Sequence, residues 1–379
     1  MPEPTVVMPR VEAHLATVPP DPFLGPGVQW WVSHAGRVLT AGAAGVGFPG
    51  RDLGVDALFP LFCATRPVMS VAMAKLVEDY DIDIEAPLRN WLSHPVLEHY
   101  EIRLADVLSH TAGLSAPDAL TAVLTPPALR SGLVAGLAPS AGWDSSKLSD
   151  YSEWTSGVLC ELLIGELTEQ RPSEWLHTKL LAPLGTDEVS FGPAADPQAG
   201  EDTKVGLTDR IACYWGNEGS GPAVPGLWFS TPHFVAELGP ALGGLGSMRS
   251  LGLFLTCVVE HLGGSCIHAS LPSPKFLARW LSWRRPPRWD RVLERNCAFG
   301  LGVMVDLESH GFGTRPSASS FAHTGWCGRC LAFADPRDRL VAAVAVTGTG
   351  GGEEVIRRWR IEFIDALYED LAEAGPWGT

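Results

Sequence analysis

The sequence predicts a large α+β fold, in which an antiparallel sheet is built from both chain ends, flanked by helices, and joined to a mainly helical lobe. β-rich runs cluster near the start of the chain and again beyond about residue 295, and helical patterns with Pro/Gly-rich loops fill the region between. With 379 residues, 46% of them hydrophobic, the chain can bury a large core. We expect a single two-lobed domain over 1–379, with an α/β lobe at about 1–60 and 295–379 and a helical lobe at about 61–294.

The first predicted element is a strand pair, followed by a helix. Gly27–Thr40 consists of two β-rich runs broken by His34-Ala35-Gly36, which is the pattern of a hairpin. After it, apolar positions recur at helical spacing, namely Met69, Met73, Leu76 and Tyr80. Because proline is tolerated only in the first turn of a helix, Pro67 places the helix start just after Cys63.

The later elements follow the same two periodicities. Helical patterns cover Trp154–Leu167, Ser173–Leu181 and Leu251–Leu262. Strands are predicted at Phe299–Leu307, Phe321–Trp326, Cys330–Ala334 and Leu340–Val346, with a last helix at Glu353–Ala372. Strands at both ends of the chain around a helical insert predict one shared sheet.

Charge and composition exclude several classes of function. The chain has 28 basic and 43 acidic residues, and its formal charge of −15 has the wrong sign for neutralising phosphates along DNA or RNA. The start of the sequence lacks the pattern of a signal peptide, and no apolar run approaches the roughly 20 residues that span a bilayer. We therefore expect a cytoplasmic protein that binds neither nucleic acid nor membrane. The eight scattered cysteines favour free thiols, catalysis or metal binding over a disulfide framework.

The first candidate for chemistry is Cys63, at the start of the predicted helix. A thiol attacks as the thiolate, and a helix N-terminus together with a fixed positive charge one turn on, here Arg66, lowers a thiol pKa. The alternative from these residues alone is a buried cysteine that packs as a small hydrophobe, with Arg66 in a salt bridge.

Two further segments carry candidate site residues. Tyr151 could act as a general acid or base, although Ser152 and Glu153 after it are also ordinary residues for the start of a helix. His323-Thr324-Gly325, on a strand before a turn, could bind a carboxylate or support an oxyanion, although a histidine at a strand end is also common without function.

Two weaker signals complete the candidates. Trp154 and Trp326 lie beside these segments and could line an aromatic-tolerant pocket, with core packing as the alternative. Cys327 and Cys330 form a single C-x-x-C, which reads as a redox pair, as a metal site with His323, or as two strand cysteines around a turn. We favour the last of these, and expect no metal and no cofactor.

Taken in order, the three segments resemble the motifs of the serine β-lactamase-like superfamily, and in particular the branch of class C β-lactamases, penicillin-binding-protein-like esterases, D-aminopeptidases and acyltransferases. In that family S-x-x-K opens a helix, Y-x-N follows, and a K-T-G or H-T-G strand closes the site. Other segments in the same order also resemble the family: Gly27–Gly45, Leu104–Leu114 (LADVLSHTAGL), Leu180–Gly185, Ala241–Ser247 and Phe299–Gly302. The resemblance covers nearly the whole chain and implies a β-lactamase/transpeptidase-like fold.

The departures from the family motifs bear on the chemistry. By this resemblance, Cys63 replaces the serine and Arg66 the lysine, while Glu153 stands where the family has asparagine. Arginine stays protonated and cannot take the proton of a serine, whereas a cysteine that already exists as the thiolate needs no such base. The two substitutions therefore compensate each other chemically. Glu153 would favour a cationic or amine substrate or balance the charge of Arg66.

The resemblance implies acyl transfer. We expect a biosynthetic acyltransferase or esterase-like hydrolase in which Cys63 is the covalent nucleophile, Tyr151 moves protons, Arg66 and His323 assist, and Glu153, Thr324, Gly325, Trp154 and Trp326 contact a small-molecule or carrier-bound acyl substrate. Two alternatives remain: a cyclisation or elimination in the same pocket, and an inactive ligand-binding homologue.

Overall fold

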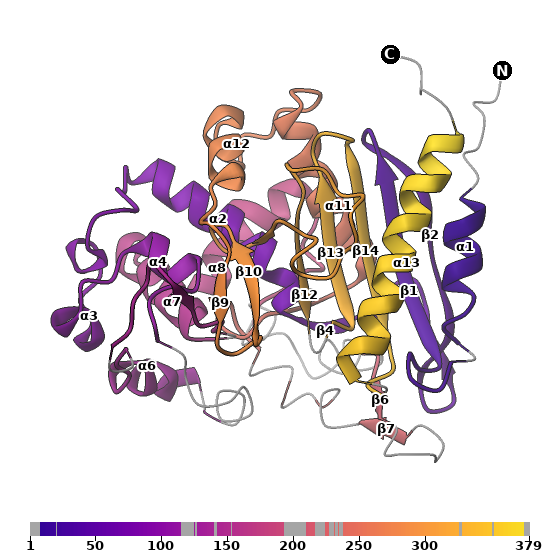
Figure 1. The fold of residues 1–379 in the computed structure, drawn as a ribbon, viewed down its shortest axis with the longest axis horizontal. Coiled ribbons are helices and arrows are strands. Elements are labelled where there is room, and N and C mark those ends of the chain that lie inside the picture. Colours follow the sequence, from indigo (N-terminus) through magenta and orange to yellow (C-terminus); the bar gives the residue numbers. More distant parts are fainter. Residues whose placement is uncertain are drawn as a thin grey trace.

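The structure is a computed structural model that describes residues 8–19, 21–114, 125, 127–139, 142–152, 154–192, 210–216, 224–226, 231, 234, 238–325, 328–350 and 352–374. A large sheet is covered on both faces by helices, and a group of helices extends beyond one edge of it (Figure 1). The α+β prediction is therefore confirmed. None of the helices described here is long and apolar enough to cross a bilayer.

Ten described strands form the main sheet, in the order β3-β2-β1-β14-β13-β12-β11-β10-β9-β5. Neighbours are antiparallel except for β5 and β9, which run parallel. The strands of the two chain ends meet where β1 pairs with β14, so that Val28 lies opposite Val346 and His34 opposite Leu340. The bounds are β1 (Gly27–His34), β2 (Arg37–Phe48), β3 (Arg51–Asp52), β5 (Leu148–Ser149), β9 (Arg288–Asp290), β10 (Arg295–Phe299), β11 (Met304–Val305), β12 (Phe321–Gly325), β13 (Cys330–Asp335) and β14 (Leu340–Val346).

The opening hairpin is confirmed, and its second strand is longer than expected. Ala35 and Gly36 both have positive φ angles, 50° and 78°, which is the backbone form of a tight hairpin turn between β1 and β2. The sequence pattern ended near Thr40, but β2 continues to Phe48. The small residues after Thr40 provide little hydrophobic alternation, yet their backbone still pairs with β1.

Helices cover the two faces of the sheet with separate cores. On one face, α1 (Pro9–Leu15) and α13 (Gly352–Glu373) lie side by side over β1 and β14 (Figure 1). Val28, Val32 and Phe363 belong to the same buried hydrophobic cluster on this face. On the other face α11 (Met248–Leu262) packs against β1, β13 and β14. It comes so close that a Cβ on Gly252 would lie 2.1 Å from the Trp31 ring. Side chains alternate across the sheet, so β1 contributes to both cores.

The helices beyond the sheet edge surround α2 (Arg66–Asp79), which is buried on every side from Arg66 to Ala74. Pro67 lies in its first turn, as predicted. The remaining described elements outside the main sheet are β4 (Phe59–Phe62), η1 (Cys63–Thr65), η2 (Leu88–Asn90), α3 (Pro95–His99), α4 (Leu104–Leu108), α6 (Pro127–Ala135), α7 (Thr155–Thr168), α8 (Pro172–Leu176), η3 (His177–Leu181), η4 (Ala182–Leu184), β6 (Tyr214–Gly216), β7 (Val224–Gly226), β8 (Gly244–Gly246) and α12 (Pro274–Ser282).

One strand prediction is wrong. The run Phe299–Leu307 is not one strand, because β10 ends at Phe299 and the antiparallel β11 begins at Met304. The chain reverses through Gly300-Leu301-Gly302, where Gly302 has a φ of 81° that favours glycine. The apolar residues on both sides of this turn produced a continuous β pattern in the sequence.

Candidate active site

Cys63 lies at a sharp junction between a strand and a helix. Phe62, the last residue of β4, has φ 48° and ψ −134°, which is unfavourable for a side-chain-bearing residue by roughly 1–3 kcal/mol. The hydroxyl of Thr65 fixes the turn, since it donates to the Phe62 carbonyl at 2.8 Å and accepts from the Gly244 N–H at 3.2 Å. Cys63 thus begins the short helical turn that leads into α2, with 8% of its surface exposed.

Arg66 is buried beside Cys63. Its guanidinium hydrogen-bonds to Cys63 and donates from Nη2 to the Ala241 carbonyl at 3.2 Å. Burial by itself lowers the pKa of Arg66, but electrostatic interactions with the ionisable groups of Cys63, Tyr151 and Cys160 outweigh it, and the pKa lies above its ordinary value. Arg66 therefore stays charged and cannot serve as a base. The same attraction favours the thiolate form of Cys63.

Tyr151 is held in place by its backbone and by its ring. Its N–H donates to the Asp290 carboxylate at 3.0 Å, and its ring stacks on Phe299 with 5.6 Å between centroids. The ring also lies 4.8 Å from that of His110 and 5.9 Å from that of His323. An electrostatic interaction with Arg66 places Tyr151 in the same group as the Cys63 pair.

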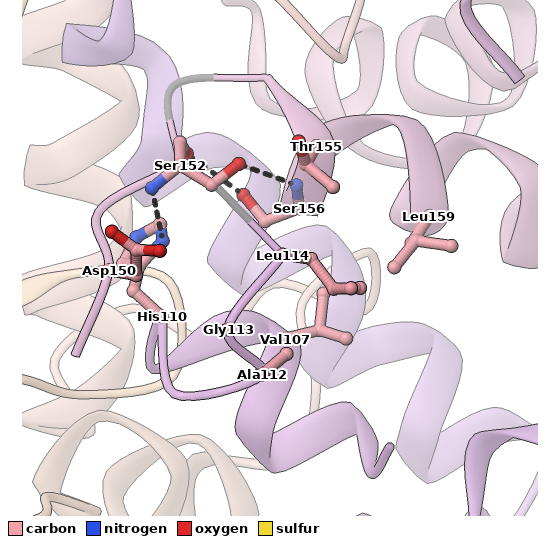
Figure 2. Close-up of a pocket in the computed structure, with 10 residues that line it drawn as sticks. All are labelled: Val107, His110, Ala112, Gly113, Leu114, Asp150, Ser152, Thr155, Ser156 and Leu159. Atoms are coloured by element: carbon pink, nitrogen blue, oxygen red, sulfur yellow. Dashed lines mark hydrogen bonds between the residues drawn. The ribbon is translucent and has the colours of Figure 1, made fainter. Parts of the chain in front are cut away.

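His110 anchors the segment that carries Tyr151. Its carbonyl accepts from the Asp150 N–H at 2.8 Å, and its Nδ1 accepts from the Ser152 N–H at 3.2 Å (Figure 2). Burial, followed by the Arg66 charge, holds the pKa of His110 well below its usual value. The imidazole is therefore neutral, with its proton on Nε2. The residue adopts a φ of 56°, which asparagine also tolerates well.

His323 and Gly325 bring β12 against the start of η1. A Cβ on Gly325 would lie 2.0 Å from the Leu61 carbonyl oxygen, so only glycine fits there. His323 is 1% exposed, and burial lowers its pKa to about 3, which makes it neutral. Its Nδ1 donates to the Thr324 carbonyl at 3.0 Å, leaving Nε2 as an acceptor with no partner among the described residues.

Two small cavities lie next to this group. One is lined by Arg66, Ser70, Cys160 and Gly302. The other, drawn in Figure 2, is lined by Asp150, Ser152 and Thr155. His110 and Ser156 border both. Each has a volume of about 10 Å³, the size of one water molecule. The exposed surface of both is mainly apolar, and both are too small to hold a substrate.

The structure brings together Cys63, Arg66, Tyr151, His323 and Gly325, which come from three separate segments. Trp154 is 1% exposed, packs in the core at the start of α7 and lines neither cavity. Glu153, Trp326 and Cys327 lie outside the described residues. Cys330 is buried within hydrogen-bonding distance of the Tyr214 hydroxyl. In the described part of the chain, no three His, Cys, Asp or Glu side chains are arranged to hold a metal.

Sequence reasoning missed three residues that support this group. They are His110, which was noted only within the segment Leu104–Leu114, and the carboxylates Asp290 and Glu161. Asp290 is completely buried and accepts from Ser149 and from the backbone of Tyr151, Val292 and Leu293. Asp290 stands between Trp289 and Arg291, and nothing in the local sequence linked it to Tyr151.

The comparisons with known proteins agree with this architecture. The chain matches the family model described as Beta-lactamase over residues 21–366, and it belongs to this family. The expected resemblance is thereby confirmed. No curated protein matches the chain.

Solved structures with the same fold cover almost the whole chain. EstA from Arthrobacter nitroguajacolicus Rue61a is 21% identical, with 97% of each chain covered and a TM-score of 0.75. A penicillin-binding protein homologue from Caulobacter crescentus is also 21% identical, with 96% of this chain and 97% of that one covered and a TM-score of 0.74. EstCE1, a hydrolase with promiscuous acyltransferase activity, is 14% identical, with 95% and 97% covered and a TM-score of 0.70. At these identities the likeness shows the fold.

Proposed function

We propose that this protein is an acyl-transfer enzyme in which Cys63 is the covalent nucleophile. The observation that carries the proposal is the hydrogen-bonded pair of Cys63 and the permanently charged Arg66 at the start of α2. Membership of the Beta-lactamase family supports acyl-transfer chemistry at this position, and the description of EstCE1 supports both hydrolysis and transfer on this fold.

In the first half-reaction the Cys63 thiolate attacks the carbonyl carbon of the acyl donor. A carbon–sulfur bond forms, and the carbonyl electron pair moves onto oxygen, where backbone N–H groups including that of Cys63 stabilise it. The intermediate then collapses, and the bond to the leaving group breaks. The Tyr151 hydroxyl gives its proton to the leaving group, so that a thioester on Cys63 and a phenolate remain.

In the second half-reaction a hydroxyl, an amine or water attacks the thioester. The Tyr151 phenolate takes the proton of the attacking group, the new acyl bond forms, and the carbon–sulfur bond breaks to restore the Cys63 thiolate. Neutral His323 offers its Nε2 lone pair to an N–H or O–H of the incoming group. Hydrolysis and transfer differ only in which group attacks.

We propose thioesters and activated esters as the donor class and a cytoplasmic, biosynthetic role. Exchange between a thiolate and a thioester makes one carbon–sulfur bond and breaks another, so it has nearly balanced energetics. None of the described cysteines forms a disulfide, which is typical of proteins from reducing compartments. The acceptor group and the carrier are not specified by these features.

The first test is intact mass after incubation with acyl thioesters, activated esters and a β-lactam. We expect an acyl adduct that maps to Cys63 and is absent in Cys63→Ala. Cys63→Ser should form no adduct, because Arg66 cannot remove the serine proton. Unmodified protein across the whole panel would overturn covalent acyl transfer and favour a non-covalent reaction or ligand binding at the same site.

A further inference from the structure

We propose that Glu161 is a positioning residue of the site, whose carboxylate, acting through the backbone of Ala241, holds the Arg66 guanidinium beside Cys63. The inference deepens the proposed function, because it explains how an arginine is kept next to the nucleophile. Its test measures only the reactivity of the Cys63 thiol and does not require an acyl substrate.

A continuous chain of hydrogen bonds joins the two charged groups. Glu161, on α7, accepts from the Ala241 N–H at 2.7 Å through Oε1. The carbonyl of the same residue, Ala241, accepts from Arg66 Nη2 at 3.2 Å. Ala241 is completely buried, so both of its backbone polar groups must be satisfied within the protein. Glu161 and Arg66 together fix one peptide segment between them.

The position of Ala241 is set by α7 itself. A Cβ on Gly157 would lie 2.5 Å from the Ala241 Cα, so the backbone of this segment rests directly on the helix. Glu161 follows Gly157 by four residues and therefore lies on the same face of α7, one turn further along. The helix contributes both the surface on which Ala241 rests and the carboxylate that orients it.

The charges around Glu161 make this contact sensitive to pH. Arg66 on α2 and Arg130 on α6 both interact with the carboxylate, and Cys160 is its neighbour on α7. Burial raises the pKa of Glu161 to about 7, against the opposing effects of the Ala241 hydrogen bond and of Arg130 and Arg66. Near neutral pH, Arg66 therefore faces only the Cys63 thiolate when Glu161 is protonated. When Glu161 is ionised, Arg66 faces both the thiolate and the Glu161 carboxylate.

The Glu161 carboxylate and the Cys63 thiolate compete for the same positive charge, that of the Arg66 guanidinium. With Glu161 ionised, part of the guanidinium charge is compensated by the carboxylate. With Glu161 neutral, the whole charge acts on Cys63, so the thiolate is favoured further. Removal of the charge alone should therefore make Cys63 more reactive, whereas removal of both the charge and the hydrogen bond should release Arg66 and make it less reactive.

The experiment is the pH dependence of Cys63 alkylation by iodoacetamide, followed by peptide mass spectrometry. All variants carry Cys266→Ser, because Cys266 is exposed and would compete for the reagent. The parent protein should show an inflection near pH 7 in addition to the thiol titration. Glu161→Gln keeps an oxygen for the Ala241 N–H, and we expect it to lose this inflection and to react about threefold to tenfold faster at neutral pH.

Two further variants separate positioning from packing. Glu161→Leu should react more slowly than the parent, as should Arg66→Gln, because both remove the positive field from Cys63. Glu166→Gln, an exposed residue on the same helix, should leave the profile unchanged. Coincident profiles for the parent protein and Glu161→Gln would overturn the proposal. So would a Glu161→Leu protein that reacts as fast as Glu161→Gln, because the hydrogen bond to Ala241 would then not be what holds Arg66 beside Cys63. A protein that shows the Glu161 effect but forms no acyl adduct would overturn only the proposed function.

Discussion

His110 fixes the Tyr151 segment from both sides, although it lies about forty residues earlier in the chain. Its carbonyl and its Nδ1 receive the N–H groups of Asp150 and Ser152, the two neighbours of Tyr151, while its ring contacts Tyr151 itself. The phenol of Tyr151 is therefore positioned by a residue that does not need to touch a substrate. A displacement of about 1 Å in such a group can cost on the order of 100-fold in rate.

This arrangement gives a prediction for two substitutions of the same residue. His110→Asn should keep kcat within about tenfold, because its Oδ1 can accept from Ser152 and asparagine tolerates the φ of 56°. His110→Leu should lower kcat on the order of 100-fold with little change in KM. The measurement is steady-state kinetics with whichever donor acylates Cys63. Equal kcat values for His110→Leu and the parent would show that Tyr151 does not depend on this contact.

The sequence could predict the residues of the site whose chemistry is local. Cys63 and Arg66 stand one turn apart, and His323 and Gly325 share a strand, so short patterns and the family resemblance reveal them. His110, Asp290 and Glu161 act on segments 40 to 140 residues away, and no spacing within the sequence records those contacts. Such residues could be found only after the fold had joined the segments.

At the scale of elements, the site depends on the close approach of β12 and the turn that carries Cys63. A Cβ added to Gly325 would overlap the Leu61 carbonyl, and backbone on both sides limits any adjustment. Gly325→Ala should therefore destabilise the protein by about 1–3 kcal/mol and slow acylation of Cys63. Denaturant unfolding and adduct kinetics measure the two effects. Gly132→Ala, in α6 with open space around the Cβ, is the matched control and should be neutral or slightly stabilising.

Elements with strong local patterns were predictable, and those defined by distant pairing were not. The β1–β2 hairpin, α2 and α11 follow from turn residues and helical spacing. In contrast, β5 and β9 have two and three residues and exist because Leu148 lies beside Trp289 in the sheet. Segments this short carry no periodicity, and the sequence could not predict them. The sheet therefore includes two strands, β5 and β9, within the range of about 61–294 that was expected to be a helical lobe.

At the scale of the whole molecule, the two ends of the chain stabilise one layer. Asp370, near the end of α13, accepts from the backbone N–H groups of Arg10 and Val11 at 3.0 Å and pairs with the Arg10 side chain. Its side chain is completely buried. The sequence predicted the shared sheet from the β-rich runs at both ends, but it gave no sign of this contact between α1 and α13.

Buried neutral histidines make the stability of the whole molecule dependent on pH. His310 is 1% exposed and donates from Nε2 to the Ala298 carbonyl at 2.7 Å, and burial lowers its pKa to about 3. The unfolded chain binds a proton at this residue below about pH 6.5, whereas the folded protein does not. The contribution of His310 is therefore complete above that pH and is lost as the pH falls toward 3, by about 1.4 kcal/mol per pH unit.

His310→Gln should reduce the acid dependence of the unfolding free energy by this amount between pH 6 and pH 4.5. Glutamine can still donate to Ala298, and it carries no titrating group. Buried carboxylates such as Asp335, whose pKa is lowered by hydrogen bonds from Ser317 and Tyr368 against the effect of burial, also contribute to acid unfolding. Because they are the same in both proteins, the difference between the two urea-unfolding curves isolates His310. His99→Gln, at an exposed position, should leave the dependence unchanged, and parallel pH curves for His310→Gln and the parent would show that His310 is protonated in the folded protein.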